Sequence, residues 1–186
     1  MVGELSVLGV EELKNQLNSL SRTAVPRASA QAVNRVASRA LSRSTARVSR
    51  STRVPRRLVR GRARLVKAST GKPVATIRVW RNDLPAIALG TASMRISRKT
   101  NGKAGSVLKI GRFTFPGAFI QQLANGRWHV LRRTSKSRYP IEVVKIAMAI
   151  PLTTAYREEV NNAMDTDMPK ELSAALSNQM RILFSR

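Results

Sequence analysis

The spacing of apolar residues along the chain changes twice. From Thr23 to about Arg50, small and apolar residues recur every three or four positions, which is the period of an α-helix. From Val74 to Met148 the pattern becomes mostly alternating, as in half-buried strands. After Pro151 the helical period returns. This order predicts an α+β fold with N-terminal helices, one of them long and Arg-rich, an antiparallel β-rich middle and two C-terminal helices.

The local signals predict these elements in more detail. In the first part we expect a strand at 4–7, a helix at 10–20, the long helix, a short basic helix broken near Gly61, and a turn at 69–73. In the middle we expect strands at 74–81, 86–89, 94–96, 127–132 and 141–148, a hairpin at 107–115 turning at Gly111, and basic loops at 97–106 and 133–138. Residues 118–123 fit a strand or a short helix. The last helix is expected to begin near Pro169.

At 186 residues the chain predicts a single domain, 1–186. Within it we expect a mainly helical basic part at 1–68, a β-rich part at 74–148 and C-terminal helices at 151–186. The buried stripe of the last helix should include Leu172, Leu176 and Leu183.

Arginines recur at every fourth position of the long helix. They are Arg35, Arg39, Arg43 and Arg47, and the basic series continues with Arg50, Arg53, Arg56, Arg57 and Arg60. A spacing of four places the first set on one helix face. No acidic residue lies between Glu12 and Asp83, so we expect the arginines to be neutralised from outside, by a polyanion or by an acidic neighbouring subunit. The other interpretation is a solvated helix face.

The net charge of +24 strengthens the first interpretation, because such a surface attracts phosphate chains or acidic proteins. Few polar base-reading residues accompany the arginines, which favours sequence-independent contact with phosphates. The chain has no cysteine, so disulfides and Cys-based zinc sites are excluded. No apolar run is long enough to span a bilayer, and no secretory signal is predicted.

No enzyme signature is legible in the sequence. His129 is the only histidine and has no neighbouring ligand set, so a structural role is favoured. Gly71-Lys72 lacks the rest of a P-loop. Trp80 and Trp128 lie among arginines, which allows base stacking, but core packing is the favoured interpretation. We therefore expect a non-enzymatic protein without metal or cofactor.

Several stretches together resemble the minor tail protein Z family, the tail-completion proteins of lambda-like long-tailed bacteriophages and prophages. They are Thr-Ala-Val-Pro at 23–26, Ala-Val-Asn-Arg-Val-Ala-Ser at 32–38, the basic residues of 56–64, Asp-Leu-Pro at 83–85, Pro-Gly-Ala-Phe-Ile-Gln-Gln-Leu at 116–123, Asn-Gly-Arg-Trp-His-Val at 125–130, Arg-Tyr-Pro-Ile-Glu-Val-Val-Lys-Ile at 138–146, Pro-Leu-Thr-Thr-Ala at 151–155 and Pro-Lys-Glu-Leu at 169–172. They occur in order over nearly the whole chain.

The resemblance implies a virion protein that finishes the head-proximal end of the tail, supports head–tail joining and helps to position genomic DNA. It implies contact with tail-terminator or tail-tube subunits and head-connector proteins, no membrane, and a stage in the host cytoplasm before assembly. A homo-oligomeric six-fold ring would present the arginines to DNA, with Trp128, Tyr139, Pro140 and the C-terminal leucines in assembly or core contacts. The alternative is a sequence-independent nucleic-acid-binding protein without a role in the virion.

Overall fold

The computed structural model describes residues 15, 18, 20–95, 107–135 and 137–184. The predicted strand at 4–7, most of the helix at 10–20 and the loop at 97–106 lie outside the described residues. The helices are a π-helical turn η1 (Leu20–Ala24), α2 (Val25–Thr52), α3 (Arg56–Arg60), a 3-10 helix η2 (Ala86–Leu89), α4 (Ala149–Thr166) and α5 (Met168–Phe184). The strands are β1 (Ala63–Val66), β2 (Thr76–Val79), β3 (Leu84–Pro85), β4 (Ala92–Arg95), β5 (Val107–Ile110), β6 (Phe113–Pro116), β7 (Ala118–Gln122), β8 (Trp128–Arg133), β9 (Ile141–Val143) and β10 (Lys145–Ile146).

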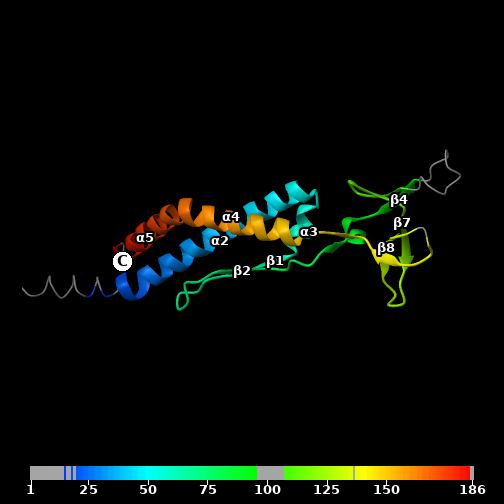
Figure 1. Cartoon of the computed structure of the whole chain (residues 1–186). Helices are drawn as coiled ribbons and strands as arrows, with labels where there is room; N and C mark the ends of the chain where they lie inside the picture. Colours follow the sequence, from blue (N-terminus) through cyan, green and yellow to red (C-terminus); the bar gives the residue numbers. More distant parts are fainter. Residues whose placement is uncertain (1–14, 16–17, 19, 96–106, 136, 185–186) are drawn as a thin grey trace, which may run out of the picture. The chain divides into compact units, whose positions relative to one another are not determined.

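The fold class is α+β, as predicted, with one long N-terminal helix, an antiparallel strand-rich middle and two C-terminal helices (Figure 1). Contacts divide the chain into two units. The helical unit comprises Met1–Ser44, Ala63–Arg78 and Tyr156–Arg186, and the β-rich unit comprises Thr45–Arg62 and Val79–Ala155. That these units form one domain stays a prediction.

In the helical unit, α2 runs beside the two C-terminal helices (Figure 1). It packs against them through small side chains. Ala28 and Ala32 of α2 pack with Ala175 of α5, and Leu172 and Leu176 lie against this cluster, as predicted. Such small residues let helix backbones approach closely. One turn further along, Val36 and Ala40 of α2 pack with Ala163 of α4, with Ile77 of β2 and Val160 beside them.

A single asparagine joins α2 to the segment after β1. The Asn34 side chain donates from Nδ2 to the Ala68 carbonyl oxygen at 2.9 Å and accepts from the Ala68 backbone N–H at 2.7 Å. These two bonds satisfy the backbone N–H and C=O groups of the buried residue 68 as a neighbouring strand would. The turn predicted at 69–73 follows directly and is closed by reciprocal backbone bonds between Ser69 and Lys72.

The β-rich unit contains two three-stranded antiparallel sheets, in the orders β4-β5-β6 and β7-β8-β9, and the antiparallel pair β3 and β10. The hairpin predicted at 107–115 is present, and Gly111 takes the positive φ of 57° that its turn requires. Of residues 118–123, left open above, Ala118–Gln122 form β7 and pair with β8. The strand predicted at 141–148 is divided into β9 and β10.

Two local predictions were wrong. Residues 86–89 form the 3-10 helix η2 rather than a strand. The run has only four apolar residues between Pro85 and Gly90, and so short a run does not distinguish a strand from a helical turn. Residues 63–66, expected to continue a basic helix, form β1 instead. Pairing with β2, the next strand along the chain, decides that conformation.

At the C-terminal end of α2, side-chain hydroxyl groups donate hydrogen bonds to backbone carbonyls, and the next residue is an arginine with a positive φ. Thr52 Oγ1 donates to the Val48 carbonyl at 2.7 Å, and Ser49 Oγ donates to the Val54 carbonyl at 2.7 Å. Arg53 follows the helix with a φ of 59°. Glycine is the usual residue at this left-handed position, since a Cβ atom is strained there.

Replacing Arg53 by glycine is therefore expected to raise the free energy of unfolding by about 0.5–1 kcal/mol. Replacing Arg53 by alanine is the control, because alanine also removes the charge but keeps the Cβ atom. Denaturant unfolding of the two variants measures the difference. Equal stabilities would contradict the assignment of backbone strain to this residue.

Candidate nucleic-acid interface

The arginine stripe of α2, defined as Arg35, Arg39, Arg43 and Arg47, has acidic partners within the chain. Arg35 Nη1 lies 3.3 Å from Glu171 Oε2, and Arg39 Nη1 lies 2.6 Å from Glu171 Oε1. Arg43 Nη1 lies 2.8 Å from Asp167 Oδ2. The expectation that these arginines lack a partner in the same chain is therefore wrong for Arg35, Arg39 and Arg43.

Matched spacing explains this pairing. Asp167 and Glu171 are four residues apart at the start of α5, and Arg39 and Arg43 are four apart on α2. Arg43 meets the earlier acid and Arg39 the later one, as in helices that run in opposite directions. The overlooked signal was the four-residue spacing of the two acids, which repeats the spacing of the arginines.

These ion pairs do not fully neutralise Arg35, Arg39 and Arg43. Three arginines share two carboxylates, and their side chains remain 58%, 49% and 47% exposed, whereas those of Glu171 and Asp167 are 12% and 15% exposed. The acids are thus covered, while part of each guanidinium side chain stays accessible to an outside anion. Arg47 is partly buried.

Exchanging Glu171 for glutamine is expected to lower the free energy of unfolding by about 1 kcal/mol, since one carboxylate serves two arginines but both are half exposed. The matched control is Glu142→Gln. Among the described residues Glu142 pairs with Arg132 alone, at 2.8 Å, and both side chains are about half exposed, so a change below about 0.5 kcal/mol is expected. Urea titration of both variants provides the comparison, and a larger loss for Glu142→Gln would contradict the network.

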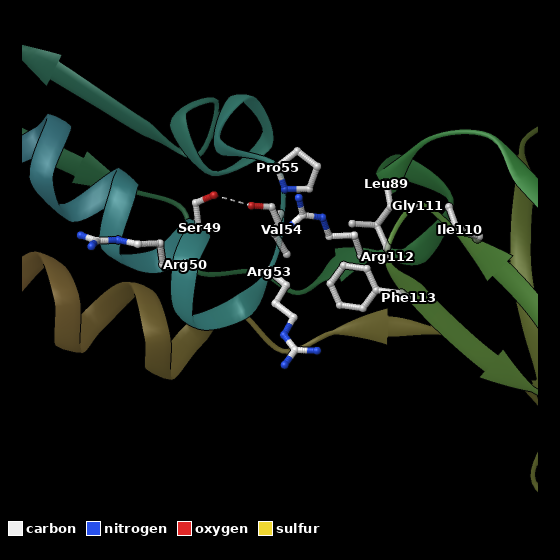
Figure 2. A pocket seen from close by; sticks show the side chains of 10 residues that line it. All are labelled: Ser49, Arg50, Arg53, Val54, Pro55, Leu89, Ile110, Gly111, Arg112 and Phe113. Atoms are coloured by element: carbon white, nitrogen blue, oxygen red, sulfur yellow. Dashed lines mark hydrogen bonds between the residues drawn. The ribbon is translucent and has the colours of Figure 1, made fainter.

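Beyond the stripe, the predicted arginines Arg50, Arg53, Arg56, Arg57 and Arg60 are all exposed. Arg50 and Arg53 line a pocket of about 580 Å³, which we call the basic pocket (Figure 2). It lies within the β-rich unit and is lined by Ser49, Arg50, Arg53, Val54, Pro55, Leu89, Ile110, Gly111, Arg112 and Phe113. Sequence reasoning missed Arg112, although its position in the turn of the predicted β5–β6 hairpin could have indicated an exposed cation.

One further arginine has a structural role. Arg62 donates to the carbonyl oxygens of Asn82 and Asp83, the latter at 3.2 Å. Burial lowers the pKa of Arg62, and the nearby Asp83 charge opposes that shift. A guanidinium has so high a usual pKa that Arg62 remains charged at neutral pH. The Arg62 side chain therefore connects the segment between α3 and β1 to the turn at residues 82–83.

The predicted assembly and core residues separate into two groups. Leu172 and Leu176 pack in the helical core, and Leu183 is partly buried. Trp128 is 57% exposed, so core packing is wrong for it; Tyr139 is 66% exposed and Pro140 is exposed as well, which leaves assembly contacts as the prediction for these two. Trp80, also expected in the core, is 50% exposed. Trp128 lies at the start of β8, after the Asn125-Gly126 turn, and its side chain is more than half exposed there.

The part of the chain that the structure describes contains no metal-binding cluster of ionisable residues. No group of three His, Cys, Asp or Glu side chains converges there. His129 is partly buried in β8, and its Nδ1 atom is buried without a hydrogen-bond partner. No helix among the described residues combines the length and the apolar character needed to cross a bilayer.

Fold and surface together define a basic α+β protein with an extended set of accessible arginines. The chain belongs to the family described as prophage minor tail protein Z (GPZ), which it matches over residues 7–186. This match confirms the resemblance stated from the sequence.

Two relatives cover the chain almost completely. It is 63% identical over 184 residues to the "Tail completion protein" of Escherichia phage N15, covering 98% of this chain and 100% of the relative. It is 47% identical over 192 residues to the "Tail completion protein Z" of Escherichia phage lambda, again covering 98% of this chain and 100% of the relative. No solved structure matches the chain.

Proposed function

We propose that this protein completes a phage tail, as the names of its two relatives indicate for those proteins, and that it does so at the head-proximal end. In this role it is a non-enzymatic component of the virion that supports head–tail joining. It is made in the host cytoplasm and then assembles with tail-terminator or tail-tube subunits and head-connector proteins. The family assignment favours this role over a nucleic-acid-binding protein without a place in the virion.

The further proposal is that its basic surface positions the genomic DNA. The observation that carries it is the exposure of the arginines: Arg35, Arg39 and Arg43 share two carboxylates and remain about half exposed, and the basic series from Arg50 to Arg60 is exposed. A six-fold ring would carry a formal charge of about 6 × 24, or +144, before counterions. Charge of that sign attracts DNA phosphates regardless of sequence.

Exposed apolar side chains supply candidate contacts with neighbouring subunits. In the β-rich unit they include Trp128 and Tyr139, and on α5 they include Met180 and Phe184, which are 43% and 55% exposed. Aromatic residues and methionine are enriched at the centres of protein interfaces. These four side chains are therefore proposed to contact tail or connector proteins or further copies of this chain.

Complementation of a phage that lacks this protein tests the role of the arginines. The informative variant changes Arg50, Arg53 and Arg57 to glutamine, because Arg39 and Arg43 have structural ion pairs. The control changes the exposed arginines Arg78, Arg81 and Arg127 to glutamine and removes the same charge. We expect the first variant to yield tailed particles with reduced infectivity and misplaced DNA, and the control to restore both.

Two results would count against the DNA-positioning role. One is normal infectivity and DNA placement with the Arg50, Arg53 and Arg57 variant. The other is an equal defect in the control, which would assign the effect to total charge. Loss of tail completion itself would be visible separately, as particles whose heads and tails fail to join.

An acidic neighbouring protein is a second candidate partner. The contacts of Arg39 and Arg43 with Glu171 and Asp167 show that the stripe accepts carboxylates spaced by four residues. An acidic helix of another subunit could bind the half-exposed guanidinium groups in the same way. A pull-down with purified tail and connector proteins after nuclease treatment separates the two: binding that persists favours the protein partner, and binding that is lost favours DNA.

A further inference from the structure

The lining of the basic pocket is unusual in containing cations and no acid. Three of its side chains are arginines, Arg50, Arg53 and Arg112, and none of its lining residues is Asp or Glu. The remainder is largely apolar, including Phe113, which is partly buried. Within the described part of the chain, neither Arg53 nor Arg112 forms an ion pair. The pocket therefore has charge available for an anionic ligand.

A second observation is the backbone of Arg53. It is the one non-glycine residue with a positive φ in the described part of the chain. Glycine would relieve the strain at this helix end, so an arginine there has a conformational cost. Strain that is retained in a pocket wall points to a role for the side chain rather than for the backbone.

The directions of the side chains indicate the kind of anion. Figure 2 shows Arg112 extending toward Val54 and Pro55, whereas Arg50 and Arg53 point in other directions. Three diverging guanidinium groups do not enclose one free phosphate. They suit a polymer whose successive phosphates reach them separately. The Phe113 ring lies beside Arg53 and Arg112 in this view and offers an apolar face.

We propose that the basic pocket binds a single strand of nucleic acid. In this arrangement Arg53 and Arg112 each contact one phosphate, and Phe113 contacts a base or sugar. A positively charged groove combined with an aromatic side chain is the usual means of holding a single strand, because an unpaired base exposes its face for stacking. The inference rests on the proposed contact with DNA, and it adds Arg112 and Phe113 and specifies the form of the nucleic acid.

The test uses the full chain and a labelled single-stranded oligothymidine of about eight nucleotides, within the site size of known single-strand binders. Fluorescence anisotropy over a range of salt gives the affinity and its salt slope. Arg53→Gly with Arg112→Gln should weaken binding about tenfold at ~0.15 M salt and reduce the slope by about 1.4, since each phosphate contact contributes about 0.7 on a single strand. Phe113→Leu should weaken binding about fivefold or more, since stacking is lost.

Two controls separate the pocket from charge and folding. Arg127→Gln removes an exposed arginine of the same unit that does not line the pocket, and it should bind almost as the unchanged protein does. Arg53→Lys keeps the charge and should retain the salt slope. Because glycine relieves the strain at residue 53, weaker binding by Arg53→Gly cannot be attributed to a less stable fold, and melting curves verify this for every variant.

Each contrary result has a distinct meaning. If the unchanged protein binds DNA and the pocket variants bind equally well, the assignment of the basic pocket as the binding site is wrong, while the proposed DNA role stands. If the unchanged protein binds neither single-stranded nor duplex DNA at low salt, both fail. If duplex DNA binds and the pocket variants lose the same affinity for duplex as for the single strand, the single-strand assignment is overturned. It is also overturned if Phe113→Leu does not change the affinity for the single strand. Tighter binding of polyglutamate than of an oligonucleotide of equal charge favours an acidic protein as the ligand.

Discussion

Replacing Ile110 by alanine is expected to lower the free energy of unfolding of the β-rich unit by about 2–5 kcal/mol. Ile110 is 0% exposed at the end of β5, and it also lines the basic pocket. Alanine would remove buried methyl groups and leave a cavity that the antiparallel pairing of β5 with β4 and β6 prevents from closing. Denaturant unfolding followed by tryptophan fluorescence measures the loss, because Trp80 and Trp128 both belong to this unit.

Ile150 provides the matched control for the same chemical change. It is 79% exposed at the start of α4, so Ile150→Ala is expected to change the free energy of unfolding by no more than about 0.5 kcal/mol. Similar losses for the two variants would contradict the assignment of Ile110 to the core. A defect of Ile150→Ala in particle assembly without loss of stability would instead mark Ile150 as a contact with a neighbouring subunit.

The second large effect is expected where α2 meets α5. Ala175 is 1% exposed and packs against Ala28 and Ala32, which are both fully buried. A leucine at position 175 would force the two helices apart, so we expect a loss of about 1–3 kcal/mol in the free energy of unfolding. The separation should also weaken the ion pairs of Glu171, which precedes Ala175 by one helical turn.

The neighbouring residue is the control for this prediction. Ala174 is exposed on α5, so Ala174→Leu adds the same side chain without overpacking and should stay within about 0.5 kcal/mol of the unchanged protein. Thermal unfolding monitored by circular dichroism compares the pair. If Ala175→Leu were as stable as Ala174→Leu, the close packing of α2 on α5 would be incorrect.

Local patterns in the sequence were sufficient for most elements of the fold. The long helix was predicted at 23–50 and is found at Val25–Thr52, and the Gly111 hairpin was predicted with its turn. In both cases a repeated period or a turn residue acts within a few neighbours, so no knowledge of distant contacts is needed. The strand β1 was missed because its conformation depends on pairing with β2.

The candidate site was predicted less completely, for a similar reason. The stripe of arginines was evident from its spacing, but its pairing with Asp167 and Glu171 joins residues separated by more than a hundred positions. Arg112 lines the basic pocket from the β5–β6 hairpin of the β-rich unit. The spacing of arginines along a helix gives no information about a residue in that hairpin. The exposure of Trp128 was not predicted, because the small number of aromatic residues favours burial of tryptophan but does not show which strand ends are exposed.

The arginines that remain accessible after the internal ion pairs define what has to be tested in the particle. An averaged electron cryomicroscopy image of the intact virion, with DNA density resolved beside the tail, tests this account most directly. We predict that the subunit lies at the head-proximal end of the tail and that Arg50, Arg53 and Arg112 face the DNA density. A subunit located elsewhere in the tail, or one whose basic pocket is turned away from the DNA, would contradict it.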